Sequence, residues 1–232
     1  MNKDYLNLVD FWNKSFKLDD DARQELKSSV NVDTVYKSLA PSIKQLEVLE
    51  GFKDCKHVLD YGCGSGWASI IMAKSGTKKI DAVDVASNSK DMVMLYSEVF
   101  NVSNNINPQT IDEEWLSRED NNKYDGFFCS NVIDVIPLDL AKDIIRESAR
   151  ITSVDAKVVY SLNYYIDSKM MEERGFVVEG SLVYIDGILR LNSLTDEEWS
   201  NLFKHYFKDV KLIYYAWPNE EKEARRLFIL SK

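Results

Sequence analysis

One stretch near the first quarter of the chain constrains the fold more than any other. The sequence from His57 to Ser69 reads H-V-L-D-Y-G-C-G-S-G-W-A-S, in which apolar residues and Asp60 precede three glycines at alternate positions. The residues that follow, Trp67 to Lys74, have the composition of a helix. A strand that passes through glycines into a helix directs backbone N–H groups and the positive end of the helix dipole towards one ligand. We therefore expect a ligand at this loop.

The spacing of Gly62, Gly64 and Gly66 distinguishes among nucleotide-type ligands. A dinucleotide-binding fold requires G-x-G-x-x-G, and the place of its third glycine falls on Trp67, which has the bulkiest of all side chains. A P-loop requires Gly-Lys-Ser/Thr, which does not follow here. The alternative is a glycine-rich turn that serves only the fold.

A second acidic residue follows where a nucleotide site needs one. Residues 79–85 read as a strand that contains Asp84, and residues 86–89 offer capping groups for the next helix. In nucleotide-binding α/β folds an acidic side chain at this place accepts hydrogen bonds from ribose hydroxyls. We interpret Asp84 as this acid, and the alternative is an incidental surface aspartate.

These residues resemble motif I and the following strand of the class I (Rossmann-like) S-adenosylmethionine-dependent methyltransferases, most closely their small-molecule (type 11/25-like) group. The resemblance spans about residues 57–232 and is strongest from Val58 to Pro137. It implies S-adenosyl-L-methionine as cofactor, S-adenosyl-L-homocysteine as product, and direct in-line methyl transfer to a small-molecule acceptor. The cofactor-binding residues that it implies are Asp60, Tyr61, Gly62, Cys63, Gly64, Gly66, Trp67, Asp84, Val85, Asp112, Glu113, Ser130 and Asn131.

The alternation of strand-like and helix-like segments predicts an α/β fold. The resemblance implies that the core is a doubly wound, Rossmann-like sheet of seven strands, mostly parallel, with an antiparallel last strand. We expect an N-terminal helical cap at residues 1–50 and a methyltransferase domain at 51–232. An insertion after the fifth strand, at about 165–192, contains a β-hairpin with its turn at Asp186-Gly187.

The N-terminal segment combines helical periodicity with many aromatic residues. We expect helices at residues 4–16, 22–27 and 32–50, with a break at Pro41. Such a segment either packs as ordinary core or, as in related methyltransferases, covers the cofactor and substrate as a lid. The residues that we assign to this lid and to the substrate are Tyr5, Trp12, Tyr36 and Tyr165.

The sequence does not single out one general base. Asp134, three residues after Asn131, and Tyr164, after the fifth strand, are the catalytic candidates because both fall at the carboxyl edge of the expected sheet. His57 precedes the first strand and belongs to the opposite edge. His205 is expected to be a partly buried structural histidine, and we predict no metal site.

The amino-acid composition disfavours some classes of binding partner. The formal net charge of −9 disfavours a nucleic-acid duplex or an anionic membrane as the main partner. Three scattered cysteines, no apolar run of transmembrane length and no signal core lead us to expect a reduced, cytoplasmic protein, monomeric or homodimeric.

Three other functions are alternatives. One is an S-adenosylmethionine-binding protein without transfer activity. Another is a nicotinamide-dependent oxidoreductase, which Trp67 disfavours. The third is a protein or nucleic-acid methyltransferase, which is disfavoured by the charge and by S-N-V-I at residues 130–133, where N-P-P-Y or D-P-P-Y would be expected.

Overall fold

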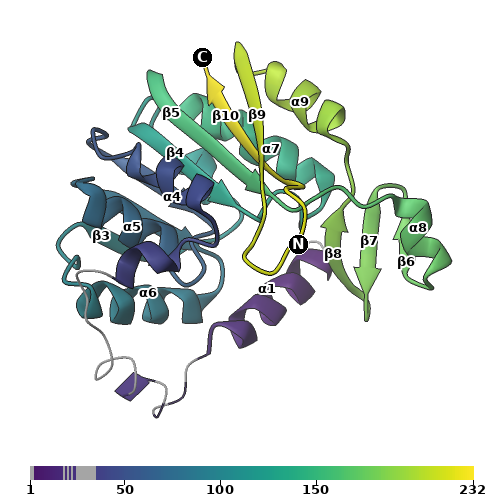
Figure 1. The fold of residues 1–232 in the computed structure, drawn as a ribbon, viewed down its shortest axis with the longest axis horizontal. Helices are drawn as coiled ribbons and strands as arrows, with labels where there is room; N and C mark the ends of the chain where they lie inside the picture. Colours follow the sequence, from purple (N-terminus) through teal and green to yellow (C-terminus); the bar gives the residue numbers. More distant parts are fainter. Residues whose placement is uncertain (1–2, 18, 20, 22, 25–34) are drawn as a thin grey trace.

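A computed structural model describes residues 3–17, 19, 21, 23–24 and 35–232 of the chain (Figure 1). Most of the helix expected at residues 22–27, and the start of the one expected at 32–50, lie outside the described residues. Within the described part of the second segment, a 3₁₀ helix ends at Leu39 and an α-helix begins at Ile43, which confirms the break at Pro41.

The core is a seven-stranded sheet in the order β3-β2-β1-β4-β5-β10-β9. Strand β10 runs antiparallel to both of its neighbours and the other pairings are parallel, as the sequence predicts. The strand order reverses between β1 and β4, and ligands of open α/β sheets bind outside the carboxyl ends of the strands at this place. The strands are β1 (Val58–Tyr61), β2 (Ile80–Asp84), β3 (Ile106–Thr110), β4 (Tyr124–Ser130), β5 (Thr152–Leu162), β9 (Asp209–Tyr215) and β10 (Arg225–Ser231).

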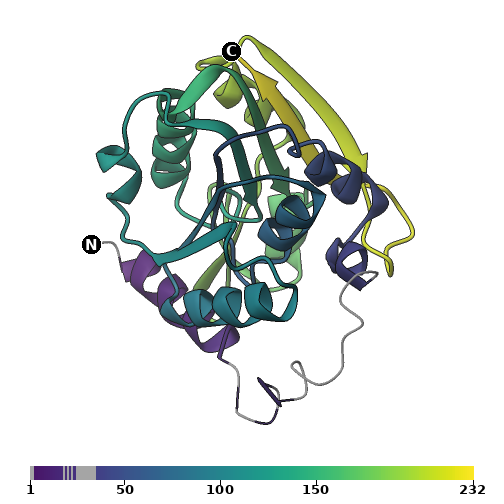
Figure 2. The same cartoon turned by 90° about the vertical axis from the view of Figure 1, so that its left-hand side faces the viewer.

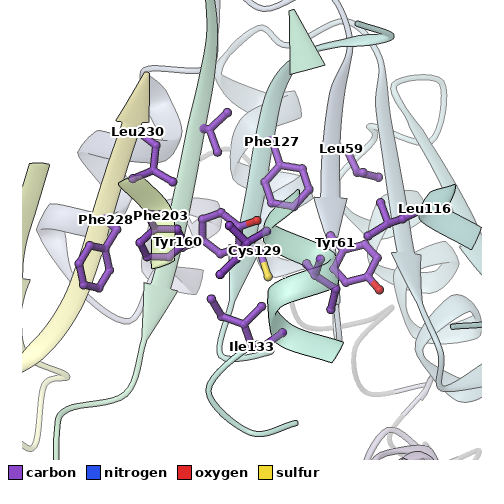
Figure 3. Packing of buried hydrophobic residues seen from close by; sticks show 14 of the residues in the cluster. Leu59, Tyr61, Leu116, Phe127, Cys129, Ile133, Tyr160, Phe203, Phe228 and Leu230 are labelled. Carbon is purple, nitrogen blue, oxygen red and sulfur yellow. The ribbon is translucent and has the colours of Figure 1, made fainter. Parts of the chain in front are cut away.

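Helices cover both faces of this sheet because successive side chains of its central strands point to opposite sides. Phe127 of β4 belongs to a core shared with α7 and α9, whereas Phe128 belongs to a core shared with α4, α5 and α6 (Figures 1 and 3). The helices are α1 (Lys3–Ser15), η1 (Tyr36–Leu39), α4 (Ile43–Glu50), α5 (Trp67–Ser75), α6 (Ser87–Val99), η2 (Trp115–Arg118), α7 (Leu138–Ile151), α8 (Ser168–Glu173) and α9 (Asp196–Lys204).

The expected hairpin is part of a separate antiparallel sheet of three strands, β6 (Val177–Glu179), β7 (Leu182–Ile185) and β8 (Ile188–Asn192). Its turn has Asp186 at φ 53° and Gly187 at φ 74°, the backbone geometry of a type I′ hairpin. We refer to β6, β7 and β8 as the insertion sheet.

Helix α1 lies between the insertion sheet and α6 (Figures 1 and 2). On one side the Arg190 guanidinium of β8 stacks on the Phe11 ring, 4.2 Å from its centroid. On the other side Asn13 Oδ1 accepts hydrogen bonds from Ser87 Oγ (3.1 Å) and the Asn88 backbone N–H (3.0 Å) at the start of α6. The domain boundary at residue 50 stays a prediction. Among the described residues, no helix has both the length and the apolar character that a membrane crossing needs.

Candidate active site

The glycine loop between β1 and α5 has a backbone that suits glycine. Gly62, Gly64 and Gly66 have φ angles of 70°, 53° and 80°, in the left-handed region that side chains with a Cβ disfavour. The backbone N–H groups of Gly62 and Cys63 both donate to the carbonyl of Val83 in β2, at 2.8 and 3.0 Å. The loop is thereby attached to the end of the neighbouring strand.

Asp84 completes this attachment with its carboxylate. One oxygen accepts a hydrogen bond from the Gly64 backbone N–H and the other accepts one from the Ala86 backbone N–H, both at 2.9 Å. Burial raises the pKa of this carboxyl above its usual range, and the backbone donors partly oppose the rise. Because a carboxylate oxygen can accept more than one hydrogen bond, Asp84 keeps capacity for a ligand.

A cavity of about 330 Å³ lies at the carboxyl ends of the central strands, against this loop. It brings together most of the cofactor residues that the sequence suggests, from four separate segments of the main chain. Those that line it are Asp60, Tyr61, Gly62, Cys63, Gly64, Trp67, Asp84, Val85, Glu113, Ser130 and Asn131, together with Tyr5 and Trp12 of the expected lid.

Helix α1 forms one wall of the cavity through a single stripe of side chains. Tyr5, Leu8 and Trp12 of the helix, and Phe16 just after it, all line the cavity. A Cβ on Gly64 would lie 3.0 Å from Cζ of Phe16, so the ring packs directly on the glycine loop. Burial, with further contributions from Glu113 and nearby aspartates, raises the pKa of Tyr5 to about 12.

The charged side chains among the described cavity-lining residues are all acidic: Asp60, Asp84 and Glu113. Asp60 is 2% exposed, and its Oδ2 accepts a hydrogen bond of 2.6 Å from Ser69 Oγ. Burial raises the pKa of Asp60 to about 7, although this hydrogen bond opposes the rise. An acidic, largely apolar cavity favours a ligand that carries positive charge.

Several predicted site residues lie outside the cavity. Asp112 is exposed and pairs with Arg118 at 2.7 Å, and the Arg118 guanidinium holds the pKa of that carboxyl below its usual range. Its neighbour Glu113 lines the cavity instead. Gly66 is the N-cap of α5 and Tyr36 lies in η1, and neither residue lines the cavity.

The catalytic candidates also lie apart from the cavity lining. Asp134 is fully buried, and its Oδ2 accepts hydrogen bonds from the backbone and side-chain N–H groups of Asn163 at 2.7 and 2.9 Å. Tyr164 is 38% exposed and contacts Arg225, with 5.5 Å from the guanidinium to the ring centroid. Tyr165 is exposed as well. Their catalytic or substrate roles stay predictions.

Neither histidine lies at the cavity. His57 Nε2 is 2.8 Å from Asp81 Oδ2 near the amino end of the sheet, as its place in the sequence suggests. His205 is exposed at the end of α9, so the expectation of a partly buried histidine is wrong. His205 is the C-cap of this helix, whose last residue is Lys204, and its Nδ1 lies 2.6 Å from the Asn201 carbonyl oxygen.

Sequence reasoning did not select several residues that line the cavity. Phe16 continues the helical spacing of Leu8 and Trp12, so periodicity alone could have identified it. Gln45 and Trp217 carry no such signal, because each reaches the cavity from a distant segment of the chain. Gln45 is held by hydrogen bonds from its Nε2 to Ser161 Oγ (3.0 Å) and Tyr215 OH (3.1 Å).

Comparisons with known proteins agree with this geometry. The sequence model of the family described as "Methyltransferase domain" matches residues 58–155. The chain is 29% identical over 119 residues to a ubiquinone biosynthesis O-methyltransferase of Neisseria meningitidis serogroup A / serotype 4A, which covers 50% of this chain and 49% of that one. It is 34% identical over 107 residues to a ribosomal protein L11 methyltransferase of Ruminiclostridium cellulolyticum, which covers 44% and 33% of the two chains. The matches thus span about half the length of these curated relatives or less.

Among solved structures, the fold resembles that of 1,6-didemethyltoxoflavin-N1-methyltransferase from Burkholderia thailandensis with bound 1,6-didemethyltoxoflavin and S-adenosylhomocysteine. The TM-score is 0.61 at 12% identity, and the alignment covers 85% of this chain and 80% of that chain.

The raised pKa of Asp60 makes a prediction about stability. The folded protein binds the Asp60 proton more tightly than the unfolded chain, where the pKa is near 3.8. The stability that this proton contributes is fully present below about pH 4 and is lost as the pH rises through about 7. The free energy of unfolding of the wild type, relative to that of Asp60→Asn, should therefore fall over this range by an amount on the order of a few kcal/mol. Urea unfolding of both proteins from pH 4.5 to 8 measures it, and a difference independent of pH would contradict the assignment.

Proposed function

We propose that this protein transfers a methyl group from S-adenosylmethionine to a small-molecule acceptor. The match of residues 58–155 to the family model described as "Methyltransferase domain" supports this proposal. The observation that carries the proposal is the joining of the glycine loop to Asp84 at the edge of an acidic cavity. When bound, S-adenosylmethionine supplies a methyl group activated by its sulfonium, which passes to the acceptor by in-line displacement.

Different residues of the cavity bind different parts of the cofactor. The Asp84 carboxylate accepts hydrogen bonds from the ribose hydroxyls, and the glycine loop lets the backbone approach the ligand closely. Glu113 is better placed than Asp112 to meet the adenine, because it lines the cavity while Asp112 is paired with Arg118. The three acids favour a cofactor with a sulfonium charge over one with a diphosphate.

Helix α1 contributes by enclosing the reaction. Methyl transfer requires alignment of the nucleophile with the methyl carbon and exclusion of water. The apolar stripe of α1 closes the cavity with Leu8, Trp12 and Phe16, and such a wall suits an organic acceptor of limited size. This wall supports a small-molecule acceptor, as does the name of the Neisseria meningitidis relative, a ubiquinone biosynthesis O-methyltransferase. The Ruminiclostridium cellulolyticum relative, in contrast, is named for a ribosomal protein.

The direct test is product formation. Purified protein is incubated with S-adenosylmethionine and a panel of small metabolites, and S-adenosylhomocysteine is quantified by mass spectrometry. We expect binding of S-adenosylmethionine in calorimetry and acceptor-dependent product. Binding without product from any acceptor would favour a binding protein without transfer activity. Tight binding of a nicotinamide dinucleotide and none of S-adenosylmethionine would contradict the proposal.

Substitution of Gly64 tests the close approach of ligand and loop. Gly64→Ala places a methyl group at a left-handed φ and 3.0 Å from the Phe16 ring, at the wall of the cavity. We expect at least a tenfold loss of S-adenosylhomocysteine affinity in calorimetry. Gly175→Ala is the matched control, because its φ of 86° is equally unfavourable but nothing lies within 4 Å of the added Cβ. Equal affinity of both variants would contradict the role of the loop.

Substitution of Asp84 tests the ribose contact. Asp84→Ala should weaken S-adenosylhomocysteine binding by about 1.5–3 kcal/mol, the usual range for hydrogen bonds to a charged group. This corresponds to a loss of roughly tenfold to over a hundredfold in affinity. Asp112→Ala is the control, because it removes an exposed carboxylate outside the cavity. It should change the dissociation constant by less than about twofold. Wild-type affinity in Asp84→Ala would identify Asp84 as a structural residue alone.

A further inference from the structure

Asn163 is the shared hydrogen-bond partner of Asn131, which lines the cavity, and of Arg225, which stacks on another lining residue, Trp217. The residue follows the last position of β5, and its Oδ1 accepts hydrogen bonds from Asn131 Nδ2 (2.8 Å) and from Arg225 Nη1 (2.7 Å). Asn131 itself lines the cavity. The Arg225 guanidinium stacks on Trp217, 3.3 Å from the ring centroid, and Trp217 also lines the cavity. The position of Asn163 therefore sets two walls of the cavity.

Asp134 in turn fixes Asn163. Its Oδ2 accepts both N–H hydrogen bonds that Asn163 directs towards the protein interior, from the backbone and from Nδ2. With Nδ2 donating to Asp134, the side-chain amide of Asn163 is oriented so that Oδ1 faces Asn131 and Arg225. The Asp134 carboxylate thus determines that the amide oxygen, and not the amide nitrogen, of Asn163 faces Asn131 and Arg225.

The backbone of Asp134 reaches the insertion sheet. Its carbonyl accepts a hydrogen bond of 2.7 Å from the backbone N–H of Asn192, the last residue of β8. The same strand carries Arg190, which stacks on Phe11 of α1. Asp134 therefore contacts both Asn163, which holds Asn131, and the insertion sheet, which packs on α1.

We propose, on the basis of the proposed methyltransferase function, that Asp134 is a positioning residue and not the general base. It holds Asn163 so that Asn131 and Trp217 keep their positions in the wall of the cavity. Two observations favour this role over a catalytic one. The Asp134 side chain is fully buried and does not line the cavity, and one of its oxygens is already used by two donors.

The test compares three variants of the full-length protein, after the wild type has been shown to form product. Asp134→Asn keeps the shape of the side chain but replaces the anionic carboxylate, which accepts both N–H groups of Asn163, by a neutral amide. Asn163→Ala removes the shared partner. Tyr160→Phe is the control, because it removes a buried hydrogen bond of 2.6 Å to Ser148 between β5 and α7, away from the cavity lining.

We expect Asp134→Asn to lower kcat/KM for the acceptor by about ten- to a hundredfold, the equivalent of losing a charge-assisted hydrogen bond. Asn163→Ala should have a similar effect, and the double variant should be no worse than the poorer single one, because both act through one contact. The pH–rate profile of Asp134→Asn should keep the shape of the wild-type profile. Tyr160→Phe should lower the melting temperature and leave the acceptor KM unchanged.

Three outcomes would overturn the proposal. Loss of one limb of the pH–rate profile in Asp134→Asn would identify a general base. Additive losses in the double variant would separate Asp134 from Asn163. Wild-type kcat/KM in Asp134→Asn would remove any role in turnover. A wild type that forms no product with any acceptor contradicts the proposed function itself, and calorimetric binding of S-adenosylhomocysteine to the variants then shows whether they still hold the cofactor site.

Discussion

The hydrogen bond from the Gly64 backbone to the Asp84 carboxylate is the interaction on which the rest of the site depends. The loop adopts left-handed φ angles that have no regular ladder to support them, and Asp84 supplies an acceptor at the place where the chain turns. The same carboxylate caps the turn after β2 through Ala86. One buried acid therefore fixes the loop, closes the turn that precedes α6 and faces the cavity. Its burial is tolerated because two backbone N–H groups compensate its charge.

The second constraint is the missing side chain at Gly64. Because Gly64 has no Cβ, Phe16 can pack on the loop, and the side chains of α1 can form one wall of the cavity. Leu8 and Tyr5 are buried by this arrangement, so α1 gains packing energy at the position where it also encloses the ligand space. Arg190 and Asn13 hold the two sides of the helix to elements that lie far apart in the chain.

The sequence predicts the fold and the loop well because their signals are local. Glycine spacing, the acid at the end of β2 and the alternation of strands and helices are all read within short windows, and the structure has the expected strand arrangement. Gln45 and Trp217 could not be found in this way, because only tertiary packing brings them to the cavity. Asp134 and Asp112 show the converse: both stand in suitable places along the chain, but burial directs one inward and an arginine pairs with the other.

The acidic lining of the cavity affects the binding of the cofactor and the binding of its product differently. Under the proposed function, the cofactor enters with a sulfonium and leaves as a thioether, in a space lined by three acids. The positive charge passes with the methyl group to the acceptor, where it is retained, released as a proton or neutralised by the charge of an anionic nucleophile. The acids attract the sulfonium of the cofactor but not the thioether of the product, whereas the hydrogen bonds to Asp84 are the same for both. Burial raises the pKa of Asp60 to about 7, so this carboxyl can be protonated near neutral pH, which limits the cost of burying an acid that has no cationic partner. The acidic lining therefore favours the cofactor over its product without requiring any movement of the loop.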